Sequence, residues 1–144
     1  MMSIDTLATL TGSATEVMTE YLASAKRGDW DAAYGLLAKD MTVHIPGESA
    51  FAGEHHGREA AIEYIQAIRN HFMDGGIELE VVDMLTSAER VALLVRERFY
   101  GDSAPVTIRR ANVYRVRGGE IVEISIFEAD QYFVDAMVDE IRPA

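Results

Sequence analysis

The second half of the chain alternates apolar and polar residues with a period of two, which is typical of β-strands that bury one face. The alternation predicts strands over residues 77–86, 90–101, 105–117 and 120–128. Gly118-Gly119 separates the last two, and a two-residue glycine turn between alternating stretches predicts a tight β-hairpin. We therefore expect four consecutive antiparallel strands in this half of the chain.

The first half repeats its apolar residues every three to four positions, which indicates helices. We expect helices over residues 15–26, 29–38 and 58–73, and a short helix over residues 131–140. Asp29 is the expected N-cap of the second helix, because its side chain can accept a hydrogen bond from a backbone N–H that has no partner within the helix.

Residues 41–45 predict a short strand, and residues 48–57 predict a loop with a further short strand around Phe51. Residues 1–13 are rich in Thr, Ser and Gly and are expected to form a flexible arm, which leaves a single domain over residues 14–144. Helices that precede a run of strands favour an α+β fold. A curved antiparallel sheet wrapped on three N-terminal helices would form a cone with an apolar cavity.

The chain has 144 residues, a formal net charge of -11 and no cysteine. The negative charge disfavours nucleic acid and anionic membranes as partners, because both are bound by basic surfaces. The absence of cysteine excludes disulfides, thiolate metal sites and a cysteine nucleophile. We find neither a basic leader before an apolar run nor an apolar stretch of bilayer length, and we expect a cytoplasmic protein.

Four polar residues share the apolar faces of the predicted strands, namely Glu97, Arg110, Asn112 and Glu128. A buried charge is costly unless it is paired, so Glu97 and Arg110 on neighbouring strands are expected to pair. The candidate substrate contacts are Glu97, Arg110, Glu128 and Trp30, although the apolar helix face around Trp30 predicts a structural role. The alternative is a register slip at a bulge, which would leave Glu97 and Arg110 as an ordinary cross-strand ion pair.

Three further residues are candidates for proton transfer or oxyanion stabilisation. His44 ends the short strand and can act as an acid or base near neutral pH, or serve as a hydrogen-bonded structural histidine. Asp130 follows the last strand and can cap the tail helix, carry a proton, or do both. Tyr21 lies on the apolar stripe of the first helix and is either a core residue or a donor to an oxyanion.

The sequence predicts no cofactor. It contains no glycine-rich phosphate loop, and its Gly-Gly pairs are typical of turns. His55-His56 is weak support for a metal site, because no third ligand follows at a suitable spacing.

Three segments carry a resemblance to a known family: TEYLASAKRGDWDAAYGLLAKDMTVHIPG, FAGEHHGREAAIEYI and VYRVRGGEIVEISIFEADQYFVD. The chain resembles the nuclear-transport-factor-two-like superfamily, and within it the SnoaL-like proteins, which include polyketide cyclases and relatives of ketosteroid isomerase. The resemblance implies a cone-shaped α+β fold with a hydrophobic pocket, cofactor-free acid–base chemistry in the enzymatic members, and homodimers packed through the sheet. Arg109, Arg115 and Arg117 share one face of their strand, as a subunit contact would require.

The resemblance also suggests individual roles. The oxyanion-hole tyrosine of ketosteroid isomerase falls on Tyr21, and its second oxyanion donor falls near Asn112. Its catalytic aspartate falls on Ile45, so the base of that mechanism is absent, while His44 stands before this site as in many SnoaL-like proteins. Polyketide cyclases of the group use a cavity aspartate, for which Asp130 is the candidate.

We expect an enzyme that transfers a proton on a small apolar carbonyl compound in the cone, with His44 or Asp130 as base and Tyr21 and Asn112 holding the enolate oxygen. One alternative is a non-catalytic module that binds a small molecule, and another is a purely structural domain. Epoxide hydrolysis is a variant of the first hypothesis, because Glu97, Arg110 and Asp130 could imitate a carboxylate–arginine–carboxylate set.

Overall fold

The computed structural model describes residues 4–71, 77–100 and 105–141. The helices are α1 (Ile4–Lys26), α2 (Trp30–Gly35), α3 (Arg58–His71) and α4 (Gln131–Ile141), and the strands are β1 (Leu37–Ile45), β2 (Gly53–His56), β3 (Ile77–Thr86), β4 (Arg90–Phe99), β5 (Val106–Arg117) and β6 (Glu120–Glu128). Within these ranges, no helix is both long and apolar enough to cross a bilayer.

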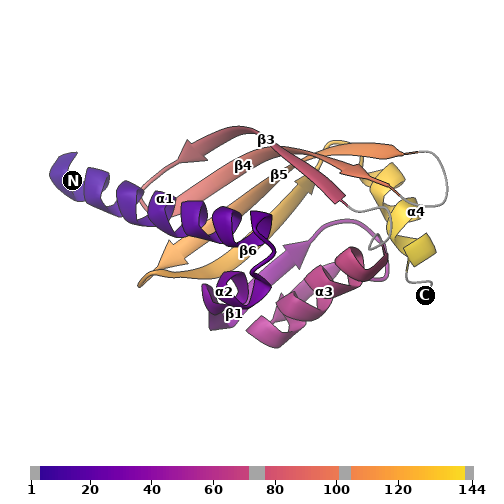
Figure 1. Cartoon of the computed structure of the whole chain (residues 1–144), viewed down its shortest axis with the longest axis horizontal. Coiled ribbons are helices and arrows are strands. Elements are labelled where there is room, and N and C mark those ends of the chain that lie inside the picture. Colours follow the sequence, from indigo (N-terminus) through magenta and orange to yellow (C-terminus); the bar gives the residue numbers. More distant parts are fainter. Residues whose placement is uncertain (1–3, 72–76, 101–104, 142–144) are drawn as a thin grey trace.

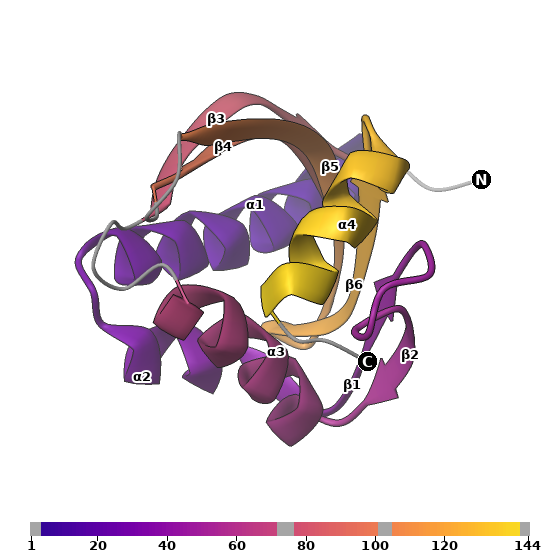
Figure 2. The ribbon, with the colours of Figure 1, turned by 90° about the vertical axis from the view of Figure 1, so that its right-hand side faces the viewer.

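The described strands form one curved sheet of six, in the order β2-β1-β6-β5-β4-β3. Neighbouring strands are antiparallel except for β1 and β6, which are parallel. The sheet bends around α1, and α3 lies beneath it (Figures 1 and 2). The helix α4 stands at one end of the curved sheet (Figure 2). The predicted α+β cone is therefore confirmed.

The concave face of the sheet, which we call the inner face, packs on the helices, and the opposite face is the outer face. The first core cluster joins α1 to the inner face and includes Met18 and Tyr21 with Leu93, Tyr114 and Ile124. The second core cluster lies beside α4 and contains Phe51, Phe99, Ile108, Val134 and Val138. Strand parity predicted the inner face of β4 and β5 correctly, because side chains alternate strictly wherever the register is regular.

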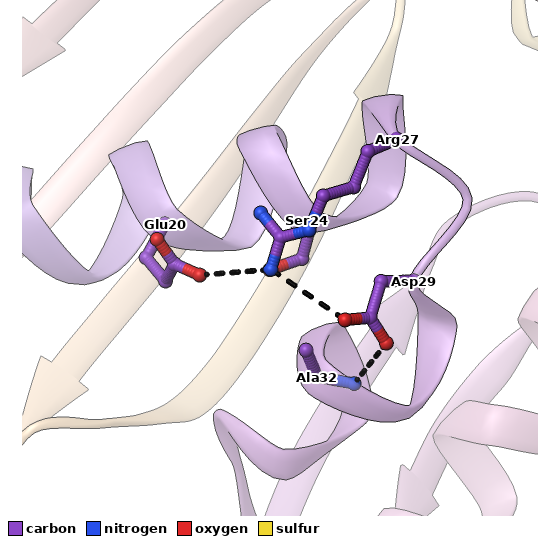
Figure 3. A network of polar contacts seen from close by, with 5 residues as sticks. All are labelled: Glu20, Ser24, Arg27, Asp29 and Ala32. Atoms are coloured by element: carbon purple, nitrogen blue, oxygen red, sulfur yellow. Dashed lines mark hydrogen bonds and ion pairs between the residues drawn. The ribbon is translucent and has the colours of Figure 1, made fainter.

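The corner between α1 and α2 confirms the predicted cap. Asp29 Oδ1 accepts a hydrogen bond from Ala32 N at 3.1 Å, and Arg27 contacts both Asp29 and Glu20 at 3.6 and 3.3 Å (Figure 3). Ser24, whose side chain donates to Glu20 at 3.1 Å, is fully buried. These contacts hold the two helices at a fixed angle, so that both reach the inner face.

Several element boundaries differ from the sequence prediction. The helix α1 begins at Ile4, whereas the sequence predicts its start at residue 15. Thr, Ser and Gly within residues 5–13 lower the local helix propensity, which is why the sequence pattern predicts a later start. The helix α2 ends at Gly35 and β1 begins at Leu37, because Leu37 and Ala38 are buried as strand residues.

The second short strand, expected around Phe51, instead spans Gly53–His56 and pairs with β1. The predicted end of the third helix at Gly75-Gly76 and the predicted turn over residues 101–103 lie outside the described residues.

The loop that follows β1 is fastened to α4. Asp135 Oδ2 accepts a hydrogen bond from Glu48 N and Asp139 Oδ1 accepts one from Ala50 N, both at 3.0 Å. Gln131 Nε2 donates to Pro46 O at 3.3 Å. Residues 46–50 and α4 therefore close the same end of the sheet as one unit.

We predict that Gly47→Ala destabilises the chain more than Gly53→Ala. Both glycines have positive φ, +94° and +120°, so each substitution costs about 1–2 kcal/mol of backbone strain. A Cβ at position 53 meets open space, whereas one at position 47 collides with Asp135 and Gln131. Displacing these side chains breaks hydrogen bonds worth about 1 kcal/mol each, so urea unfolding should show an additional loss of about 1–2 kcal/mol for Gly47→Ala.

The excess should shrink when Asp135→Ala is already present, because the collision with Asp135 and the hydrogen bonds that Asp135 accepts from Glu48 N and Gln131 Nε2 are then gone, and only the collision with Gln131 remains. Equal losses for the two glycine variants would show that the loop does not depend on α4.

Candidate active site

Three charged side chains lie together on the inner face near α4, and we call Glu97, Arg110 and Glu128 the inner triad. Arg110 Nε donates to Glu128 Oε1 at 3.0 Å, and Arg110 Nη1 lies 3.5 Å from Glu97 Oε2. Only 14%, 10% and 4% of the side-chain surfaces of Glu97, Arg110 and Glu128 remain exposed. The triad is thus a largely desolvated carboxylate–guanidinium–carboxylate group inside the fold.

Strand register explains why these residues meet. Arg110 of β5 stands directly opposite Glu128 of β6 in the antiparallel ladder. On its other side Arg110 pairs with Val95 of β4, so Glu97 is its diagonal neighbour on the same face. The predicted contact between Glu97 and Arg110 is present, and Glu128 adds a second carboxylate that sequence reasoning had placed inward without a partner.

The triad contains two carboxyl groups for one guanidinium. Burial raises the pKa of Glu128, and the attraction of Arg110 opposes this rise without cancelling it. Burial alone would lower the pKa of Arg110, but the two glutamates outweigh it, so the guanidinium stays charged. A carboxyl whose pKa is shifted toward neutrality can both accept and donate a proton, which is the requirement for acid–base chemistry.

Tyrosine hydroxyls approach the triad from two sides. Tyr64 of α3 is electrostatically coupled to all three triad members, and burial raises its pKa. Tyr114 lies on the inner face of β5, four residues after Arg110. Burial raises its pKa to about 12. The ring of Tyr21 lies 6.1 Å from that of Tyr114. Burial is the main cause that raises the pKa of Tyr21, and the neighbouring Tyr114 and Tyr34 raise it further. All three phenols therefore stay protonated at neutral pH and can donate hydrogen bonds.

Asn112 lies between Arg110 and Tyr114 on the inner face, and its Oδ1 is buried without a hydrogen-bond partner among the described residues. The opposite side of its amide interacts with the Tyr114 hydroxyl. An unpaired buried carbonyl oxygen costs about 1–3 kcal/mol. A ligand hydroxyl or an ordered water would remove this cost, so Asn112 is a candidate binding group beside the triad.

The structure places His44 on the outer face, away from the residues just described. Val43 faces the core at 3% exposure, so its neighbour His44 points outward by strand alternation. There the ring lies 4.0 Å from Glu54 and 3.8 Å from Glu123, and 41% of the side chain is exposed. His44 is therefore not brought together with Tyr21 and Asn112.

Asp130 caps α4, since its Oδ1 accepts a hydrogen bond from Phe133 N at 3.1 Å, and its side chain is exposed. Ile45, at the position that matches the aspartate of ketosteroid isomerase, packs against both core clusters. Trp30 lies 4.0 Å beneath the guanidinium of Arg69 and beside Tyr34, so it fastens α2 to α3.

The two adjacent histidines have separate partners. His55 Nε2 is 2.6 Å from the Phe51 carbonyl oxygen, and His56 Nδ1 is 3.4 Å from Thr42 Oγ1. In the part of the chain that the structure describes, no group of three His, Asp or Glu side chains is arranged to hold a metal ion.

Sequence reasoning missed Tyr64. It gave the third helix no inward tyrosine, whereas Ala61, Ile62, Tyr64 and Ala67 contact the core clusters. Alanines at positions 61 and 67 lie three residues on either side of Tyr64, so a small-residue stripe was the available signal.

We predict that Arg110→Met lowers the free energy of unfolding by about 3–5 kcal/mol, because two buried carboxylates then lose the only cation of the triad. The triple variant Glu97→Gln, Arg110→Met, Glu128→Gln should recover most of this loss, since no buried charge remains. Arg117→Met is the matched control on the same strand, because 59% of the Arg117 side chain is exposed. Urea unfolding at neutral pH measures all three, and a triple variant as unstable as Arg110→Met would contradict the electrostatic explanation.

The model of the SnoaL-like domain matches residues 18–124. None of the curated proteins compared with the chain matches it significantly. Bal32a, from a soil-derived mobile gene cassette, superposes with a TM-score of 0.80 at 21% identity over 90% of this chain and 98% of that protein. A nuclear-transport-factor-two-like protein from Burkholderia xenovorans LB400 superposes with a TM-score of 0.68 at 20% identity, over 89% of this chain and 96% of that protein. TerC, which was co-crystallised with polyporic acid, superposes with a TM-score of 0.73 at 13% identity, over 88% of this chain and 98% of that protein.

Identities this low establish the shared fold alone. The family model, in contrast, extends from α1 to β6 and includes two of the three triad residues. The chain shares the fold of nuclear-transport-factor-two-like proteins, and it belongs to the SnoaL-like family, as its sequence segments predicted.

Proposed function

We propose that the chain is a cofactor-free acid–base enzyme of the isomerase, dehydratase or cyclase type, which acts on a small apolar carbonyl compound in a pocket at the inner face. The observation that carries the proposal is the desolvated inner triad, in which Glu128 has a raised pKa beside the unpaired Asn112 Oδ1. The co-crystallisation of TerC with polyporic acid supports the capacity of this fold to hold a small molecule.

In the proposed reaction the ionised Glu128 removes a proton from the carbon next to the substrate carbonyl. The C–H electrons form the enolate double bond, and the negative charge moves to the carbonyl oxygen. The hydroxyls of Tyr114 and Tyr21 donate to that oxygen, which gives Tyr21 the oxyanion role that the sequence suggested. Glu128 then returns the proton to another carbon, or to a leaving hydroxyl in a dehydration.

The other inward groups position the reactants. Arg110 holds Glu128 in one orientation through its 3.0 Å hydrogen bond, and Glu97 fixes the other side of the guanidinium. Asn112 accepts a hydrogen bond from a hydroxyl of the substrate. Glu128 is a better candidate base than His44 or Asp130, because it shares the inner face with the tyrosines while those two are solvent-exposed.

We predict that Glu128→Gln lowers turnover by about 10²-fold or more, because an amide cannot accept the proton. The parent's rate should fall as pH decreases through the raised pKa of Glu128, since only the ionised carboxylate is a base. β-Keto esters and hydroxylated cyclic ketones are suitable substrates for the screen. The measurement is the steady-state rate from pH 4 to 9 for the parent and the variant.

His44→Gln and Asp130→Asn are the matched variants for the two bases that the sequence suggested, and Asp130→Asn retains the helix cap. Both should react like the parent. A large loss in either, with Glu128→Gln active, would contradict the assignment. Saturable binding of these compounds without turnover by the parent would favour a non-catalytic binding module.

A second candidate reaction is epoxide hydrolysis, which the carboxylate–guanidinium–carboxylate order of the triad favours. One ionised glutamate would take a proton from water, and the water oxygen would attack an epoxide carbon. The second glutamate, protonated from the start, would give its proton to the departing ring oxygen. Both acids are then essential, so Glu97→Gln should abolish styrene oxide hydrolysis as completely as Glu128→Gln. The carbonyl reaction instead tolerates Glu97→Gln better than Glu128→Gln.

We also propose that the chain forms a homodimer through the outer face of its sheet. Leu85, Leu94 and Phe127 project from this face with 53%, 36% and 57% of their surfaces exposed. Leu94 of β4 and Phe127 of β6 stand on either side of Ala111 of β5. Leu85 of β3 pairs with Ala92, which precedes Leu94 by two residues on the same face of β4, so the apolar surface is contiguous. Exposed apolar patches of this kind mark contact surfaces.

Light scattering at micromolar concentration should therefore give twice the 15.9 kDa chain mass. Leu94→Arg should return the mass to that of one chain, because a buried guanidinium would lack a partner in the contact. Tyr132→Ser, which alters a side chain of α4 that is 91% exposed, is the control and should remain dimeric. A monomeric parent would contradict the proposal.

A further inference from the structure

A groove of about 550 Å³ lies between the outer face of the sheet and α4, outside the inner triad. It follows the segment of β5 where β6 has ended, since β6 pairs with β5 only as far as Arg110 and the chain then turns into α4. Arg96 and Arg109 form one side, and Asp130 and Phe133 of the α4 region form the other. Its volume lies within the range of small-molecule sites, which is roughly 300–1,000 Å³.

Arg109 is the distinctive charge in this groove. The two other outward arginines of β5, Arg115 and Arg117, each lie 3.5 Å from Glu89, and Arg96 lies 3.1 Å from Glu80. Arg109 has no ion-pair partner among the residues that the structure describes. An unpaired guanidinium in a chain of net charge -11 is a local site for an anion, and its planar fork suits a carboxylate.

The rest of the groove is suited to an apolar body. Phe133 is 44% exposed at its rim, while Ile108 and Val134 are buried members of the second core cluster that reach its wall. The carboxylate of Asp130 also lines the groove, but its Oδ1 is engaged by Phe133 N at the start of α4. A ligand that placed its acid on Arg109 could therefore lay a ring against Phe133.

We propose that this groove binds a small carboxylic acid with an aromatic or other flat apolar body, with Arg109 as the acid-recognising residue. The site goes beyond the proposed proton transfer, because it lies on the other side of the sheet from Asn112 and the tyrosines and uses none of the triad. The proposed binding of an acid in this groove does not depend on whether the inner face is catalytic.

The test uses 2-naphthoate and its neutral analogue 2-naphthamide with the full chain. Titration calorimetry should show binding of the acid at least about tenfold tighter than that of the amide, because one charge-assisted contact is worth about a factor of ten at an accessible site. Arg109→Gln should weaken the acid about tenfold and leave the amide unchanged. In ¹H–¹⁵N spectra the acid should shift the backbone amides of Thr107, Arg109, Ala129 and Phe133.

Arg117→Gln is the matched control, because it removes an outward arginine of the same strand outside the groove, and it should bind the acid like the parent. Equal affinity for acid and amide, an unchanged affinity in Arg109→Gln, or no binding of the acid at millimolar concentration would each overturn the proposal. A dimeric parent that becomes monomeric on Arg109→Gln would also overturn it, since Arg109 would then be a subunit contact. Circular dichroism verifies that the variants stay folded.

Discussion

Arg110 allows the inner face of the sheet to hold two acids within the core. Without its guanidinium, Glu97 and Glu128 would stand on either side of β5 in a desolvated layer, where each ionised carboxylate costs several kcal/mol. With it, the charges are fixed by strand register, and neither acid can turn away without breaking a contact. Such an arrangement is weak support for stability and makes the triad a candidate site, because a purely structural core could use apolar residues there.

The position of the triad depends on how the end of the sheet is closed. The second core cluster packs α4 against Phe99 and Ile108, and the hydrogen bonds from Asp135 and Asp139 hold residues 46–50 on the same helix. Glu128 is the last residue of β6, only three residues before α4 begins. Glu128 is thus buried next to this closed end, and desolvation by burial is the main cause of its raised pKa.

The two faces of the sheet have separate chemistry because side chains alternate along each strand. Arg109 and Arg110 are adjacent in sequence, yet one lines the outer groove and the other belongs to the inner triad. The same alternation separates Val43, which is in the core, from His44, which is among outer glutamates. A one-residue change of register would exchange the faces of these side chains, so the register at the bulges decides which of them point inward.

The local pattern of residues determined the four long strands, the Gly118-Gly119 hairpin and the inward direction of Glu97, Arg110, Asn112 and Glu128, because alternation is a property of each strand by itself. It also predicted the family through segments that span most of the fold. The face of His44 was decided by the parallel pairing of β1 with β6, a contact between residues some eighty positions apart that periodicity within either segment cannot reveal. Tyr64 reached the triad because α3 turns its alanine stripe inward, which depends on the space left beneath the curved sheet. The raised pKa of Glu128 likewise came from tertiary structure alone, because desolvation is a property of everything packed around a side chain and not of its neighbours in the sequence.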